Sequence, residues 1–188
     1  PPRILNLFAY SGVASLHAAN AGAEVTHIDA SKKAIQAGFD NRELSHLTDA
    51  PLRFITEDAL QFVLRELRRG KQYDGIILDP PKYGRGPKNE IWQLHQDLPA
   101  LLHQCRILLS DTPLFLVATI YAVRMTAISL HSSMVSILDG LGGDLQSGEI
   151  AIAEIAGEHN QIPRAIGQAL FSRWVNTPLK SNEYRDSN

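Results

Sequence analysis

The chain has 188 residues, of which 44% are hydrophobic and 20% charged, and its formal net charge is −2 at pH 7. These values are ordinary for one globular domain with a sizeable core, and they exclude a general electrostatic attraction to nucleic acid. We find no apolar run near the roughly 20 residues of a membrane span, and we expect no membrane partner. The single cysteine, Cys105, excludes an internal disulfide and leads us to expect a cytoplasmic protein.

The first part of the chain predicts alternating strands and helices. Short apolar runs at residues 4–8, 24–28 and 52–56 predict strands. Helix-forming segments follow them at residues 15–21, 32–44 and 60–69. A fourth strand, residues 75–78, must end at Asp79, because Pro80 and Pro81 cannot donate a backbone hydrogen bond.

The second part continues the pattern and then changes it. Residues 82–89 are predicted as a loop, and the next segments as a helix at 92–109, a strand at 114–120 and a helix at 122–138. Two strands then follow in succession, at 144–155 and 165–175, joined by a polar loop at 157–164.

Five strand–helix repeats followed by two strands predict an α/β fold. We expect a Rossmann-like, doubly wound, mostly parallel seven-stranded sheet with an antiparallel edge hairpin and helices on both faces. Residues 1–176 should form one domain, and residues 177–188 a polar, disordered tail. Because the chain begins with Pro1 and a strand follows almost at once, we expect an amino-terminal region of the parent protein to be absent.

Acidic residues lie at the ends of consecutive predicted strands. Asp29 ends the second strand, Asp58 follows the third and Asp79 follows the fourth. Ligands bind at this edge of open α/β sheets, where a carboxylate can accept both hydroxyls of a ribose. Each acid alone is more often a helix cap, but their recurrence favours a ligand that contains a nucleoside.

The turn after the first strand narrows the kind of nucleoside ligand. It contains only Gly12, so it lacks the Gly-x-Gly-x-x-Gly pattern of dinucleotide folds. It also lacks the Gly-Lys-Ser/Thr ending of a phosphate-binding loop. Both absences argue against NAD and ATP. The histidines show no metal-ligand spacing, so we predict no metal site.

Four motifs together resemble those of the class I S-adenosylmethionine-dependent methyltransferases, and among these the ribosomal-RNA large-subunit base methyltransferases of the cytosine-C5 and guanine type. Residues 6–12 resemble the cofactor loop, 27–32 the ribose segment, 57–59 the adenine segment and 79–83 the Asp-Pro-Pro-x-Phe/Tyr catalytic signature. The resemblance extends over residues 4–174. It implies S-adenosyl-L-methionine as cofactor and methyl transfer to a base of structured, ribosomal RNA.

The resemblance also implies residue roles. The methionine part of the cofactor would lie in the first turn, the ribose at Asp29 and the adenine at Asp58. The implied cofactor-binding residues are Phe8, Ala9, Tyr10, Ser11, Gly12, Asp29, Ala30, Ser31, Asp58, Ala59 and Asp79. The implied catalytic residues are Asp79, Pro80, Pro81 and Tyr83. Tyr83 would stack on a base flipped out of the RNA, although a packed rim aromatic is the plain alternative.

One departure from the family bears on the chemistry. Cytosine-C5 members use a cysteine nucleophile after the fifth strand, but residues 117–122 here contain none. Cys105 falls on the apolar side of a predicted helix. Transfer to nitrogen is therefore favoured over covalent C5 chemistry.

The identity of the acceptor stays open at this point. Lys82, Arg85 and Lys88 cluster after the catalytic signature and either contact RNA phosphates or form an ordinary solvated loop. The alternatives to an RNA base methyltransferase are an enzyme acting on a small molecule or a protein side chain, and a non-catalytic S-adenosylmethionine- or RNA-binding module. The sequence gives no indication of the oligomeric state.

Overall fold

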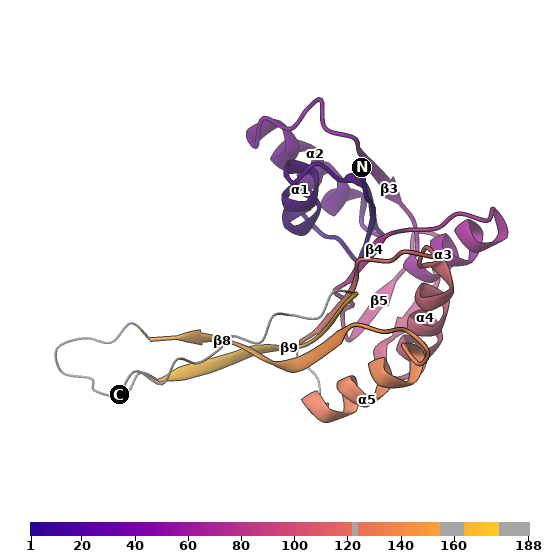
Figure 1. Ribbon diagram of the computed structural model, residues 1–188. Coiled ribbons are helices and arrows are strands. Elements are labelled where there is room, and N and C mark those ends of the chain that lie inside the picture. The colour runs from indigo at the N-terminus through magenta and orange to yellow at the C-terminus, as the bar shows by residue number, and fades with distance from the viewer. Residues whose placement is uncertain (122–123, 155–163, 177–188) are drawn as a thin grey trace, which may run out of the picture.

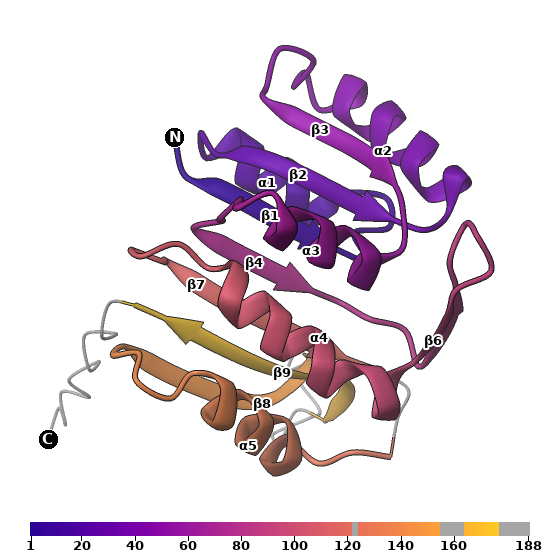
Figure 2. The same ribbon diagram turned by 90° about the vertical axis from the view of Figure 1, so that its right-hand side faces the viewer.

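The computed structural model describes residues 1–121, 124–154 and 164–176. Its main sheet has seven strands in the order β3-β2-β1-β4-β7-β9-β8 (Figure 2). The parallel strands are β1 (Arg3–Leu7), β2 (Glu24–Asp29), β3 (Leu52–Thr56), β4 (Gly75–Leu78) and β7 (Phe115–Ile120). The antiparallel edge strands are β8 (Asp144–Ala153) and β9 (Ala165–Val175). The predicted Rossmann-like, doubly wound fold is confirmed.

Within the described residues, five helices cover the sheet on both faces (Figure 1). One face carries α1 (Val13–Asn20) and α2 (Lys32–Leu44). The other face carries α3 (Ala59–Arg68), α4 (Leu94–Leu108) and α5 (Ala127–Ile137). Because both faces are covered, the central strands are apolar along nearly their whole length, as parallel strands generally are.

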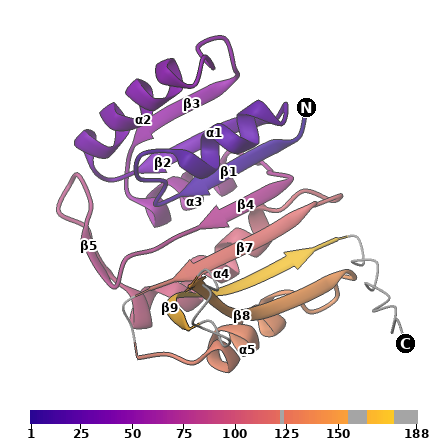
Figure 3. The same cartoon turned by 90° about the vertical axis from the view of Figure 1, so that its left-hand side faces the viewer.

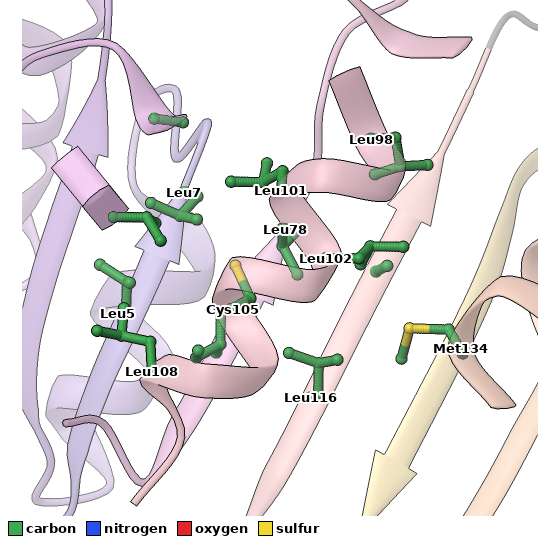
Figure 4. Packing of buried hydrophobic residues seen from close by; sticks show 14 of the residues in the cluster. Leu5, Leu7, Leu78, Leu98, Leu101, Leu102, Cys105, Leu108, Leu116 and Met134 are labelled. Carbon is green, nitrogen blue, oxygen red and sulfur yellow. The ribbon is translucent and has the colours of Figure 1, made fainter. Parts of the chain in front are cut away.

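The larger of the two hydrophobic clusters lies between the sheet and the helices α3, α4 and α5. Leu5 and Leu7 of β1, Leu78 of β4 and the apolar side of α4 meet there, with Cys105 among them (Figure 4). These side chains are fully buried. Their burial fixes the sheet against α4 and therefore also fixes the ends of β1 and β4 relative to each other.

The prediction of a loop over residues 82–89 is wrong for residues 83–85, because they form the first strand of a β-hairpin. Its strands, β5 (Tyr83–Arg85) and β6 (Ile91–Gln93), pair antiparallel, and the hairpin lies beyond the ends of the parallel strands (Figure 3). The Trp92 indole donates to the carbonyl of Pro81 at 2.7 Å. Because Trp92 pairs with Gly84, it belongs to β6, and α4 begins at Leu94 instead of at residue 92.

Two of the other boundaries that differ from the predictions have a clear local cause. β1 ends at Leu7, because Phe8 turns the chain with a positive φ of 56°. α5 begins at Ala127, where the Thr126 side chain accepts a hydrogen bond from the Ser129 amide, instead of at residue 122. Residues 122–123, the end of the predicted strand at 155, most of the predicted loop at 157–164 and the predicted tail at 177–188 lie outside the described residues.

A buried polar network joins the first three elements below the turn that follows β1. Asn6 Nδ2 donates to Ser15 Oγ at 2.9 Å, and Ser15 Oγ lies 3.0 Å from Nδ1 of His27. All three side chains are buried, and His27 Nε2 has no hydrogen-bond partner within the described parts of the chain. Burial lowers the pKa of His27 from 6.5 to about 4. The imidazole is therefore neutral at pH 7.

None of the helices in the described ranges combines the length and the apolar character that crossing a membrane requires.

We predict that His27 makes folding sensitive to acid. The unfolded chain gains a proton on this imidazole as the pH falls below 6.5, whereas the folded chain gains it only near pH 4. The free energy of unfolding therefore falls by about 3 kcal/mol as the pH decreases from 6.5 to 4. Below pH 4 this histidine causes no further loss. Urea unfolding of the wild type and of His27→Gln at pH 7, 5 and 4 measures the difference. Parallel pH profiles for the two proteins would contradict the prediction.

Candidate functional site

A cavity of about 430 Å³ lies at the carboxyl ends of the parallel strands. The order of the strands reverses there, between β1 and β4, which is where ligands bind in open α/β sheets. Its walls come from the segments after β1, β2, β3, β4 and β7 and from the β5–β6 hairpin. The lining residues are Phe8, Tyr10, Ile28, Asp29, Ala30, Ser31, Glu57, Asp58, Ala59, Asp79, Pro81, Gly84, Arg85, Trp92 and Tyr121.

The turn after β1 has an unusual backbone. Phe8 and Tyr10 adopt positive φ angles of 56° and 47°, which are rare for bulky side chains. The surroundings hold this conformation, because the Ala9 amide donates to the carbonyl of Ile28 at 2.9 Å. Strained backbone of this kind persists mainly at functional sites. No pattern in the sequence predicts these positive φ angles.

Gly12 ends the turn and starts α1. Its φ of 91° is in the left-handed region, and a Cβ at this position would lie 3.3 Å from Cε1 of His27. Glycine meets both constraints without strain. On the other side of the turn, Asn41 Nδ2 of α2 donates to the carbonyl of Ser11 at 2.9 Å. The turn is therefore held from β2 and from α2.

Asp29 is positioned by two backbone amides. Oδ2 accepts the Tyr10 amide at 2.9 Å, and Oδ1 accepts the Ser31 amide at 2.8 Å. Each carboxylate oxygen can accept two hydrogen bonds, so each keeps capacity for a further donor. Asp29 can therefore accept two neighbouring hydroxyl groups at once.

Asp58 is both a helix cap and a cavity residue. Its Oδ1 accepts a hydrogen bond from the amide of Gln61 at 3.0 Å and so caps α3. A helix cap is the alternative role of each strand-end acid. Burial raises the pKa of this carboxyl, and the neighbouring Glu90 and Asp97 raise it further, although the Gln61 amide acts in the opposite direction.

The part of the cavity away from Asp29 and Asp58 lies around Asp79. Thr119 Oγ1 of β7 donates to Asp79 Oδ1 at 2.5 Å, which fixes the carboxylate at the end of β4. Trp92 forms part of the wall here, and its indole is hydrogen-bonded to Pro81 while its ring lies 4.9 Å from that of Phe8. Trp92 thus joins the hairpin to the turn after β1.

The structure brings nine of the sequence-predicted site residues into the cavity wall. They are Phe8, Tyr10, Asp29, Ala30, Ser31, Asp58, Ala59, Asp79 and Pro81. The remaining predicted site residues, which do not line the cavity, are Ala9, Ser11, Gly12, Pro80 and Tyr83. The first three form the strained turn or its end, and Pro80 is buried. Tyr83 lies on β5 with 53% of its surface exposed.

Sequence reasoning missed Trp92, Arg85 and Tyr121 as wall residues. The apolar spacing predicts a helix from residue 92, which hides the contact of Trp92 with the cavity. The signal for Tyr121 is its position directly after a predicted strand that neighbours the one ending in Asp79. For Arg85 the sequence indicates only a positive charge.

Cys105 lies away from the cavity. It is fully buried in the core on α4, and burial raises the pKa of its thiol far above the ordinary value (Figure 4). Within the residues that the structure describes, no three His, Cys, Asp or Glu side chains are grouped so that they could hold a metal ion.

Comparison with known proteins gives a family and several relatives. The model of the family described as conserved hypothetical protein 95 matches residues 1–112. Ribosomal RNA large subunit methyltransferase K/L of Pseudoalteromonas translucida is 36% identical over 112 residues, which cover 58% of this chain and 16% of the relative. Ribosomal RNA large subunit methyltransferase I of Shewanella frigidimarina is 36% identical over 81 residues, which cover 43% and 20%.

A solved structure extends the similarity over nearly the whole chain. The crystal structure of the SAM-dependent methyltransferase from Agrobacterium tumefaciens is 49% identical with a TM-score of 0.90, and the match covers 94% of this chain and 56% of that one. The chain spans less than a quarter of the length of the curated relatives above. The family resemblance drawn from the motifs is confirmed.

We predict that Asp58 stabilises α3 as a helix cap and not through its charge. Asp58→Ala should lower the free energy of unfolding by about 1 kcal/mol, because the Gln61 amide loses its acceptor. Asp58→Asn should keep the stability, since Asn caps helices as well as Asp does. Urea unfolding at pH 7 checks both. An equal loss in the two variants would show that the charge, and not the cap, is what stabilises α3.

Proposed function

The chain belongs to the conserved hypothetical protein 95 family, and from its similarity to ribosomal RNA methyltransferases we propose that it transfers a methyl group from S-adenosylmethionine to a base of ribosomal RNA. The observation that carries the proposal is the single cavity shared by Asp29, Asp58 and Asp79. The part of the cavity at Asp29 and Asp58, which would bind the nucleoside, therefore adjoins the part at Asp79, which we call the reaction half. Residues 1–176 are proposed to form the catalytic domain.

The cavity wall fits the cofactor in the chemistry of its donors and acceptors. Asp29 has free acceptor capacity for the two ribose hydroxyls. Asp58 and Ala59 offer a polar and an apolar surface for the adenine, and Phe8 and Tyr10 lie where the methionine part would be held. The turn after β1 has no glycine-rich cradle for phosphates. This donor set suits a nucleoside without a pyrophosphate.

The catalytic work of the chain is mainly positioning. When bound, the cofactor supplies a sulfonium methyl group, whose S–C bond breaks with its electron pair remaining on sulfur. Asp79, fixed by Thr119, accepts a hydrogen bond from an N–H of the base and takes up its proton as the new N–C bond forms. The carbonyl of Pro80 is proposed as a second acceptor at this point.

Two observations support RNA as the substrate. The relatives from Pseudoalteromonas and Shewanella are named for the methylation of large-subunit ribosomal RNA. The β5–β6 hairpin next to the cavity carries three cationic residues, Lys82, Arg85 and Lys88, at or beside its strands. Cations at this place can neutralise the phosphates of a bound strand. Methyl transfer to a small molecule or a protein side chain is the alternative.

Tritium transfer from S-adenosylmethionine decides between these acceptors. We expect label in unmodified large-subunit ribosomal RNA transcribed in vitro, because the hairpin cations favour that substrate. Denatured total protein and a small-molecule extract serve as parallel acceptors. Label in either of them, with none in RNA, would establish the alternative.

We predict that Asp29 contributes strongly to cofactor affinity. Asp29→Ala should weaken the binding of S-adenosylhomocysteine by about 1–3 kcal/mol, because hydrogen bonds between a carboxylate and the ribose are lost. Titration calorimetry measures the change. Asp40→Ala, on the exposed side of α2, is the matched control for the lost charge and should bind normally. Unchanged affinity in Asp29→Ala would remove Asp29 from the site.

We predict that Asp79, and not Cys105, is required for methyl transfer. Asp79→Ala should lower kcat by about 10²-fold, as does the loss of other positioned catalytic groups. Cys105→Ala should keep near-wild-type turnover, because the thiol is buried outside the cavity and its raised pKa makes it a poor nucleophile. Both are measured by tritium transfer to RNA. Loss of activity in Cys105→Ala, with covalent trapping on 5-fluoropyrimidine RNA, would establish C5 chemistry instead.

A further inference from the structure

The reaction half of the cavity contains an aromatic side chain to which no role has yet been given. Tyr121 follows β7, the strand next to β4, and both strands run in the same direction. Leu78 pairs with Ala118 in this register, so the residues just beyond each strand, including Asp79 and Tyr121, border the same space. Tyr121 keeps 42% of its surface exposed. A large part of this residue is therefore accessible at the wall of the cavity that Asp79 also lines.

The electrostatic surroundings of Tyr121 are consistent with this position. Partial burial raises the pKa of the phenol, and the carboxylates of Asp79 and Asp29 raise it further. The phenol therefore stays protonated at pH 7. Its ring is neutral and lies close to both carboxylates of the proposed site.

Arg85 adds a positively charged side chain to the cavity wall. It lies on β5 and lines the cavity. Across the residues that the structure describes, no ion pair or side-chain hydrogen bond involves Arg85, as is also the case for the exposed Arg68, but Arg68 lies outside the cavity wall. An unpaired guanidinium at a cavity wall is available for an anion of the ligand.

We propose that Tyr121 and Arg85 form the subsite for the methyl acceptor. Tyr121 stacks on the target base, Arg85 binds a phosphate of the same or the adjoining nucleotide, and Asp79 faces the N–H of the base. The acceptor is thereby a nucleotide, whose base stacks on Tyr121 and whose phosphate supplies the anion for Arg85. This inference rests on the proposed function and names the residues that recognise its substrate.

The subsite assigns base stacking to Tyr121 instead of Tyr83. Tyr83 belongs to the Asp-Pro-Pro-Lys-Tyr segment, but it is 53% exposed and does not line the cavity. Its neighbours Gly84 and Arg85 do line it. The two tyrosines therefore provide a matched pair, because each is exposed enough to be replaced without disturbing the core.

The experiment compares Tyr121→Leu, Tyr121→Phe and Tyr83→Leu by tritium transfer to in vitro transcribed ribosomal RNA. Stacking on an aromatic side chain contributes enough that Tyr121→Leu should lower kcat/KM about 10- to 100-fold. Tyr121→Phe keeps the ring and should stay within about threefold of the wild type, whereas Tyr83→Leu tests the stacking role that the catalytic signature implies for Tyr83. The affinity for S-adenosylhomocysteine, measured by calorimetry, should be the same in all four proteins.

A second arm tests Arg85 with a charge-matched control. Arg85→Gln should weaken RNA binding and reduce the slope of log affinity against log salt by about one, as expected for one lost phosphate contact. Arg68→Gln, at the exposed end of α3 and outside the cavity wall, makes the same change in net charge and should keep the wild-type slope. Equal slopes for Arg85→Gln and the wild type would overturn the phosphate contact.

The outcomes separate the subsite from the function on which it rests. An active wild type whose Tyr121→Leu variant keeps its kcat/KM overturns the stacking role, and loss in Tyr83→Leu alone would transfer that role to Tyr83. A lower cofactor affinity in Tyr121→Leu would reduce Tyr121 to a wall of the cofactor half. A wild type that binds S-adenosylhomocysteine but methylates no RNA would overturn the proposed function itself.

Discussion

The reversal of strand order between β1 and β4 is the constraint on which the candidate site depends. The chain leaves β1 toward α1 on one face of the sheet, whereas it leaves β4 toward the hairpin and α4 on the other face. The two connections therefore diverge, and a crevice remains between them. Because the parallel strands all end at this edge, Asp29, Asp58 and Asp79 border one cavity although they lie far apart in the sequence.

Trp92 forms part of the wall of that crevice. Its indole donates to the carbonyl of Pro81, and its ring packs against Phe8, so it connects the segments that diverge from β4 and β1. Only 4% of Trp92 is exposed. The hairpin is thereby held beside the cavity, and its Arg85 lines the cavity wall. A flexible loop of the same composition would not place a charge at a defined distance from Asp79.

Several residues of the site stabilise the fold and line the cavity at the same time. Asp58 caps α3, and Asp29 holds the strained turn through the amide of Tyr10. Below that turn, the buried network of Asn6, Ser15 and His27 ties β1, α1 and β2 together. The polar groups that shape the cavity are thus themselves fixed by hydrogen bonds, which preorganises them for binding.

Local patterns in the sequence were sufficient for the parallel strands, the edge hairpin and the acids at the strand ends. Apolar runs, caps and prolines act on their immediate neighbours, so the doubly wound fold and the positions of Asp29, Asp58 and Asp79 could be read from the residues alone. Tertiary contacts decided the rest. The β5–β6 hairpin depends on the packing of Trp92 against Phe8, the positive φ of Phe8 depends on bonds to β2, and the place of Tyr121 depends on the register of β7 beside β4. Each of these features joins residues that are distant in the chain, and a pattern that reports only on sequence neighbours carries no information about such contacts.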